Sequence, residues 1–219
     1  MQVSEAVRRR MSVRAFRPDP VPAEVVRGLL EDAARAPSGG NVQPWNVRAV
    51  TGAPLADLLR IVREEGPDPE PGYRIYPDNL WEPHRTRRFQ IGELMYGAMG
   101  IPREDKAARL AHLARNAELF GAPVGVFVFI DRRMGPPQWS DLGMYVQTLM
   151  LLATERGLDT CAQEYWAIYS KKVERFFNMP EELMLFCGVA LGHRDETAAV
   201  NTLQSPRAPF EEWGALVGF

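Results

Sequence analysis

A pattern suited to binding an anion stands at residues 9–16, "RRMSVRAF". Arg10, Ser12 and Arg14 alternate there, so an extended segment would place their three side chains on one face. Guanidinium groups offer forked donors that match phosphate oxygens, and a hydroxyl adds another donor. The chain has a formal net charge of -2, so the cluster is not part of a general basic surface. The residues alone leave two interpretations open, a phosphate cradle or the solvated basic end of a helix.

Other kinds of site have little support in the sequence. Neither a P-loop nor a GxGxxG motif is present, so a nucleotide would have to be held by side chains. The two cysteines, Cys161 and Cys187, lie in apolar contexts that favour inert buried thiols over redox-active ones. Three histidines are scattered without the spacing of metal ligands, so we expect no metal site. His193 either faces a phosphate or simply ends a strand, and the second reading is favoured.

Length and composition indicate one globular domain. The chain has 219 residues, of which 46% are hydrophobic and 25% charged. No apolar run approaches the roughly 20 residues that span a bilayer, so we expect no membrane association. The near-neutral charge argues against nucleic acid as a partner. Two cysteines and no apolar leader favour the reducing cytoplasm.

Periodicity and breakers predict the main elements. Strands are expected at 46–50, 123–131 and 183–192, with a short strand or turn at 158–163. Helices are expected at 5–10, 19–36, 54–65, 85–100, 103–121, 140–157 and 170–178. Ser4 would cap the first helix, and Ser140 or Asp141 the helix at 140–157. The fold class is therefore α+β, with a few buried strands inside a shell of helices.

Four stretches in order make the chain resemble the FMN-dependent nitroreductase family. "RRMSVRAF" is similar to its opening motif, and "APSGGNVQPWNV" (36–47) to its second signature. "GLDTCAQEYW" (157–166) falls where the family places its flavin-facing turn. "GVALGHRD" (188–195) and "NTLQSPRAPFEEW" (201–213) resemble its closing strand and tail. The resemblance covers the chain from about residue 9 onward, apart from residues 64–100.

The resemblance implies a nitroreductase-like fold, with a central, mainly antiparallel sheet surrounded by helices. Residues 1–219 would form one FMN-binding domain within an intertwined homodimer, and the tail from about 207 to 219 would wrap the partner subunit. Five large apolar side chains among the last thirteen residues agree with a buried tail. Two FMN sites would lie at the subunit interface, each built from both chains.

Roles for individual residues follow from the resemblance. Arg10, Ser12 and Arg207 would hold the FMN phosphate, with Met11 contributing mainly backbone. Arg14 would reach the pyrimidine side of the isoalloxazine, where a permanent cation stabilises the reduced flavin. The partner subunit would supply Pro37, Ser38, Gly39 and Asn41. Gln163, Glu164 and Tyr165 would line the ring near N5 through backbone groups, and no obligate catalytic acid or base is expected.

The implied activity is reduction of nitroaromatic or quinone-like acceptors with NADPH or NADH, by a ping-pong mechanism in one open site. Two alternatives remain. One is other flavin chemistry, such as reductive dehalogenation, enoate reduction or flavin degradation. The other is a non-catalytic flavin-binding protein. The basic cluster "HRTRR" (84–88) is either a solvated helix start or a site for an anionic aromatic substrate or for the phosphates of the nicotinamide donor.

Overall fold

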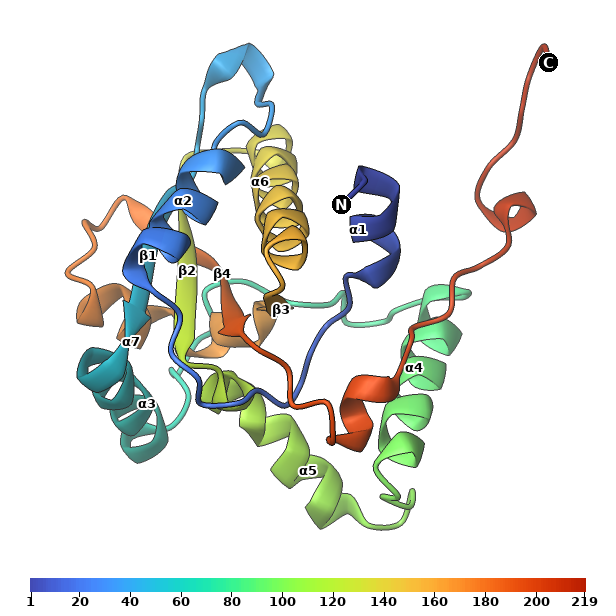
Figure 1. The fold of residues 1–219 in the computed structure, drawn as a ribbon, viewed down its shortest axis with the longest axis horizontal. Helices are drawn as coiled ribbons and strands as arrows, with labels where there is room; N and C mark the ends of the chain where they lie inside the picture. Colours follow the sequence, from blue (N-terminus) through green and yellow to red (C-terminus); the bar gives the residue numbers. More distant parts are fainter.

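One four-stranded sheet lies at the centre of the computed structural model, which describes residues 1–219 (Figure 1). Its strands are β1 (Asn46–Thr51), β2 (Val124–Asp131), β3 (Asp159–Gln163) and β4 (Leu183–Gly192). They are ordered β1-β2-β4-β3, and all three pairings are antiparallel. The predicted α+β fold with a mainly antiparallel sheet is confirmed.

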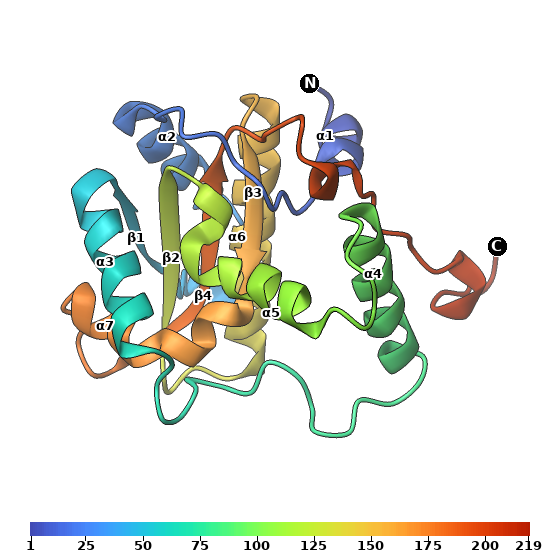
Figure 2. The same cartoon turned by 90° about the horizontal axis from the view of Figure 1, so that it is seen from below.

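Strand β2 shows why the sheet is central, because both of its faces are buried. Val126 and Val128 point into one core, which contains residues of α2 (Ala23–Ala33) and α6 (Pro136–Glu155). Phe127 and Phe129 point into the other, with residues of α3 (Gly52–Glu65) and α7 (Ser170–Phe176). The alternation of side chains along the strand therefore builds two cores and three layers (Figure 2).

Both predictions of serine or aspartate caps are wrong. Helix α1 (Val3–Arg9) begins after Gln2 without a side-chain cap, so Ser4 lies inside its first turn. Helix α6 begins at Pro136, and Gly135 donates its N–H to Gln138 Oε1 at 3.2 Å. Proline suits a first helical turn because the missing N–H would have no partner there. The structure uses Asp141 differently, as the acceptor for the N–H of Gly39.

The predicted helix at 103–121 is divided in two. Helix α5 (Lys106–Ala114) ends at Ala114, and 3-10 turns follow over Arg115–Gly121. Leu119 and Phe120 adopt φ of 50° and 54°, and both side chains are buried in the core beside β2. The free energy gained by burying these two large apolar side chains thus offsets the conformational cost of the left-handed backbone.

Helix α4 (His84–Ala98) and α5 project from one side of the body (Figure 1). They are joined by an ion pair between Arg109 and Glu93 and by an edge contact between Tyr96 and His112. No helix of the structure is long and apolar enough to cross a membrane.

The tail runs past α4 and away from the body (Figure 1). It follows the 3-10 helix Ala199–Thr202 and contains only a short turn at Phe210–Glu212. Leu216, Val217 and Phe219 are 70%, 86% and 102% exposed. These apolar side chains therefore have no cover on their own chain.

Candidate flavin site

The segment with the anion-binding pattern runs along the free edge of β3. Arg10 follows the last residue of α1, and its φ of -59° and ψ of 127° are no longer helical. Ser12 then forms a parallel bridge with Thr160. The Val13 N–H donates to the Thr160 carbonyl at 3.0 Å, and the Val13 side chain is fully buried. Arg10, Ser12 and Arg14 alternate with buried Val13, as the sequence predicts for an extended segment.

Cys161, the next residue on β3, is influenced by four of the predicted site residues. Burial raises the pKa of its thiol to about 11, and Glu164 adds to the rise. Arg14, Ser12 and Arg10 all lower the same pKa, so each lies near the sulfur. The fold therefore gathers the N-terminal segment and the turn after β3 around one buried atom. A thiol with so high a pKa is unreactive at neutral pH.

Arg10 also lies near Arg207, far away in the sequence. Burial first, and then the positive charge of Arg207, hold the pKa of Arg10 below its usual range. Neither arginine forms an ion pair with a carboxylate, whereas neighbouring Arg9 pairs with Glu5 at 3.5 Å. The Arg207 guanidinium donates only to the carbonyls of Ser205 and Pro206, both at 2.9 Å. Arg10 thus experiences a second positive charge and has no carboxylate partner, an environment that suits a dianionic phosphate such as that of FMN.

In the turn after β3, two of the three predicted residues have side chains engaged within the chain. β3 ends at Gln163, and a 3-10 helix follows over Glu164–Tyr169. The Gln163 amide donates to the carbonyl and to the side-chain oxygen of Asn116, both at 3.0 Å. The Tyr165 ring lies against Tyr169, with their centroids 6.0 Å apart. The Glu164 side chain, between them, is exposed.

The loop Pro37–Asn41 lies apart from these residues within one chain. It lies at the start of α6, where the Gly39 N–H contacts Asp141 at 3.3 and 3.4 Å, whereas Ser12 pairs with β3 beyond the other end of that helix (Figure 1). Gly40 and Asn41 have φ of 58° and 57°, a backbone that glycine adopts freely. Pro37, Ser38, Gly39 and Asn41 are therefore not brought to Arg10 by this chain's own fold.

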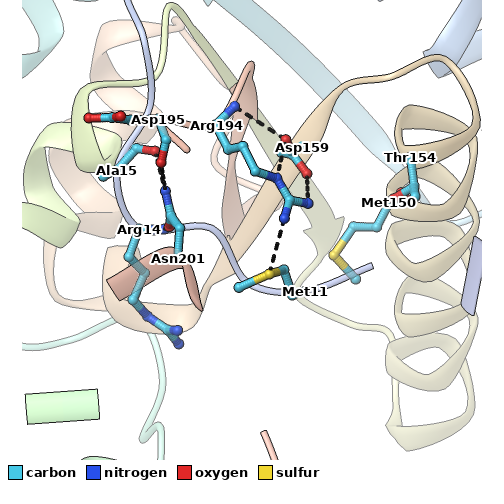
Figure 3. A network of polar contacts seen from close by, with 9 residues as sticks. All are labelled: Met11, Arg14, Ala15, Met150, Thr154, Asp159, Arg194, Asp195 and Asn201. Atoms are coloured by element: carbon cyan, nitrogen blue, oxygen red, sulfur yellow. Dashed lines mark hydrogen bonds and ion pairs between the residues drawn. The ribbon is translucent and has the colours of Figure 1, made fainter. Parts of the chain in front are cut away.

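Asn201 holds the N-terminal segment in place (Figure 3). Its side-chain oxygen accepts the Arg14 N–H at 2.9 Å, and its amide donates to the carbonyls of Ala15 at 2.8 Å and Asp195 at 2.9 Å. The residue is buried, so these bonds replace water completely. Sequence reasoning assigned Asn201 no role, because its main partners lie 187 and 186 residues away.

A second anchor joins Arg194 to Asp159 (Figure 3). The Arg194 Nε donates to Asp159 Oδ2 at 2.8 Å, and Nη2 contacts the other carboxylate oxygen. Arg194 Nη1 also lies 3.4 Å from the sulfur of Met11. His193 follows the end of β4, and its carbonyl accepts the Arg17 N–H at 2.9 Å. Arg194, held by Asp159, thus supports the Met11 side chain. No motif in the sequence pointed to the Arg194–Asp159 pair.

The fold is an antiparallel sheet between two helical layers, with an arginine-rich extended segment along one edge. Comparison with known proteins identifies the family that has this fold. The family model described as Nitroreductase family matches residues 7–193. The chain belongs to the nitroreductase family, which confirms the resemblance inferred from its motifs.

Relatives of established activity match along nearly the whole chain. A 4-nitrobenzoate reductase of Pseudomonas putida is 37% identical over 213 residues, covering 96% of this chain and 93% of that protein. A nitrobenzene nitroreductase of Ectopseudomonas oleovorans is 33% identical over 225 residues, covering 98% and 96%.

Solved structures agree in fold. The FMN and NADPH-dependent nitroreductase NfnB of Sphigopyxis sp. strain HMH has a TM-score of 0.96 and 44% identity, with complete coverage of both chains. The FMN-dependent NfnB of Mycobacterium smegmatis, solved in complex with NADPH, has a TM-score of 0.91 and 32% identity, covering 99% of this chain and 98% of that one. Both neighbours are described as FMN-dependent, and NADPH is named for each, which are the cofactor and one of the donors expected from the sequence.

Proposed function

We propose that this protein is an FMN-dependent oxidoreductase that uses NADPH or NADH to reduce nitroaromatic or quinone-like acceptors. The observation that carries the proposal is the extended segment along β3, which holds Ser12 against Thr160 and leaves Arg10, within the field of Arg207, without a carboxylate partner. The relatives named above reduce 4-nitrobenzoate and nitrobenzene, and two solved neighbours depend on FMN and bind or use NADPH. Bound FMN would supply the redox chemistry, accepting a hydride from the dinucleotide and passing electrons to the acceptor.

Each site residue then has a defined task. Arg10, Ser12 and Arg207 would hold the phosphate, and Met11 would contribute backbone. Arg14 would place a permanent cation at the pyrimidine side of the ring, with its own backbone fixed by Asn201. Gln163, Glu164 and Tyr165 would offer main chain near N5. No side chain is required to donate or remove a proton in this scheme.

The complete site requires a homodimer in this proposal. Residues 1–219 form one FMN-binding domain built on a single sheet, and Pro37, Ser38, Gly39 and Asn41 of the partner subunit complete its pocket. Exposed apolar side chains on α1, α5 and α6 support a large contact between subunits; they are Val3, Val7, Leu110, Leu113 and Met144. Two free, buried cysteines suit the reducing cytoplasm, where we place the protein.

The tail, residues 207–219, would wrap the partner in this dimer. A cavity of about 620 Å³ between α2 and β1 offers a surface for it, lined by Val26, Leu30, Trp45 and Val47 among others. β1 is an edge strand, and its free backbone groups are available to an added segment. The tail has no charged side chain after Glu212, which suits this apolar groove.

Anaerobic reduction tests the proposed function. The purified protein is expected to be yellow, with about one FMN per chain and little FAD, because the cradle suits a terminal phosphate. Addition of NADPH or NADH should bleach the colour, and 4-nitrobenzoate, nitrobenzene or a quinone should restore it. A protein that neither dinucleotide bleaches is a flavin binder rather than a reductase, and extraction of FAD would contradict the assigned phosphate site.

A further inference from the structure

Besides the apolar cavity beside β1, a second cavity lies between α4 and the tail, and its lining is basic. It measures about 960 Å³, and its charged lining consists of Arg87, Arg88, Arg207 and a single acid, Glu212. His84 and two exposed aromatic residues, Tyr76 and Trp213, also line it. Because Arg207 lines this cavity and also lies near Arg10, the cavity adjoins the phosphate end of the flavin site.

The positive charge of this cavity is only partly neutralised. Glu212 pairs with Arg87 at 2.6 Å. Arg88 has no carboxylate partner, and its guanidinium lies 4.1 Å from the centre of the Tyr76 ring. Arg85, on the same helix, lies outside the cavity and is paired with Glu82 at 2.7 Å. Arg207 is assigned above to the FMN phosphate, so Arg88 is the arginine of this cavity that is free to bind a further anion.

The size and lining of the cavity favour a nucleotide over a small aromatic acid. A volume of about 960 Å³ is at the upper end of the roughly 300–1,000 Å³ of ligand pockets, far more than one benzoate ring fills. Arginine forks match phosphate oxygens, and aromatic side chains such as Tyr76 and Trp213 offer planar surfaces to a base. Both features are matched by an adenosine that carries phosphate groups.

We propose that this cavity binds the adenosine 2′-phosphate end of NADPH, with Arg88 and His84 at the phosphate. This inference rests on the proposed function and selects between its two donors. NADH lacks the 2′-phosphate, so the contact with Arg88 discriminates against it. The wild-type enzyme accordingly prefers NADPH, and the preference comes from helix α4 rather than from the FMN cradle.

Substitution of Arg88 provides the test. Arg88→Gln retains a long polar side chain but removes the charge. With a saturating acceptor, kcat/KM for NADPH should fall about tenfold or more, as expected for loss of a charged hydrogen bond, while kcat/KM for NADH should change less than about threefold. Adenosine 2′,5′-bisphosphate should compete with NADPH more strongly than AMP does, and the variant should lose this difference. Arg85→Gln is the matched control and should leave the preference unchanged.

Three results would overturn the proposal. Equal rates with NADH and NADPH in the wild-type enzyme, or an equal fall for both in Arg88→Gln, would show that the cavity does not read the 2′-phosphate. Loss of FMN from the variant would assign Arg88 to the cofactor instead. A loss confined to 4-nitrobenzoate, with nitrobenzene unaffected, would assign the cavity to the acceptor's carboxylate. Failure of both dinucleotides to bleach the wild-type flavin would instead contradict the proposed function itself.

Discussion

The two edges of the sheet are finished in different ways. Along β3, the chain's own N-terminal segment supplies the Ser12–Thr160 bridge and the Val13 hydrogen bond. Along β1, no segment pairs with the outer side of the strand, and an apolar cavity lies beside it. One edge is therefore completed within the chain, and the other is left for a further segment.

The β3 edge is completed by one chain, whereas the proposed filling of the β1 edge requires a second chain. The covered β3 edge carries the segment proposed to bind the FMN phosphate, and Asn201 and the Arg194–Asp159 pair hold it in place. Open apolar edges in soluble proteins are usually covered or blocked. A tail with apolar residues that have no cover on their own chain is the matching segment, so we expect the β1 edge to be filled by a second copy.

Deletion of residues 208–219 should have the largest effect. Burial of one large apolar side chain contributes roughly 1.5–3 kcal/mol, and the deletion removes five of them. The dimer should weaken by more than about a hundredfold, and FMN should be lost with it because Arg207 and the partner's loop are no longer held. Light scattering and flavin fluorescence measure the two effects.

A milder pair of variants sharpens this test. Leu216→Asp should weaken the dimer, because the charge could not enter the groove between α2 and β1. Glu211→Gln, on the exposed turn of the tail, should leave it intact. A truncated chain that stays dimeric and retains FMN would show that the tail packs on its own subunit.

Loss of Asn201 should open the covered edge. Asn201→Ala leaves the N–H of Arg14 and the carbonyls of Ala15 and Asp195 without their partner. A buried group left unsatisfied costs about 1–3 kcal/mol, so the free energy of unfolding should fall by about 3 kcal/mol. Thr202→Ala, at an exposed neighbouring position, is the control for denaturant unfolding. A fall below about 0.5 kcal/mol would mean that Asn201 does not anchor the segment.

Arg10→Ala should weaken FMN binding by about 10- to 100-fold, because a charged hydrogen bond to phosphate contributes roughly 1.5–3 kcal/mol. Equilibrium dialysis or flavin fluorescence measures the change. Arg9→Ala is a close control, since Arg9 is exposed and paired with Glu5. Equal loss of FMN in both variants would show that the arginine cluster acts only as a general positive field.

Arg14→Ala should have the smallest effect on cofactor content and a distinct effect on its chemistry. FMN should stay bound, whereas the midpoint potential should fall and reduction by NADPH should slow, because a fixed cation stabilises the reduced flavin. Spectroelectrochemistry measures the potential. If Arg10→Ala and Arg14→Ala lose FMN equally and have the same potential once reconstituted, the proposed division of roles is wrong.

The sequence was most informative where the signal is local. The apolar run at 123–131 predicted a buried strand, found at Val124–Asp131, and the alternation of Arg10, Ser12 and Arg14 predicted an extended face. Prediction from the sequence failed where contacts between distant residues override the local helical propensity, as in the helix expected at 103–121. Leu119 and Phe120 leave the helical conformation because their side chains complete a core built by residues far away in the sequence.

The sequence by itself determined the fold class, the family and the extended face that carries Arg10, Ser12 and Arg14, because strand alternation, helical periodicity and spaced motifs are short-range properties. Only the tertiary structure decided which cations stand together and which edge is open. The positive charge of Arg207 acts on Arg10, and the Arg14 N–H donates to Asn201, although these partners lie almost the whole chain apart in sequence. No local pattern specifies such contacts, since they arise only when the folded cores bring the segment after α1 to the segment that follows β4.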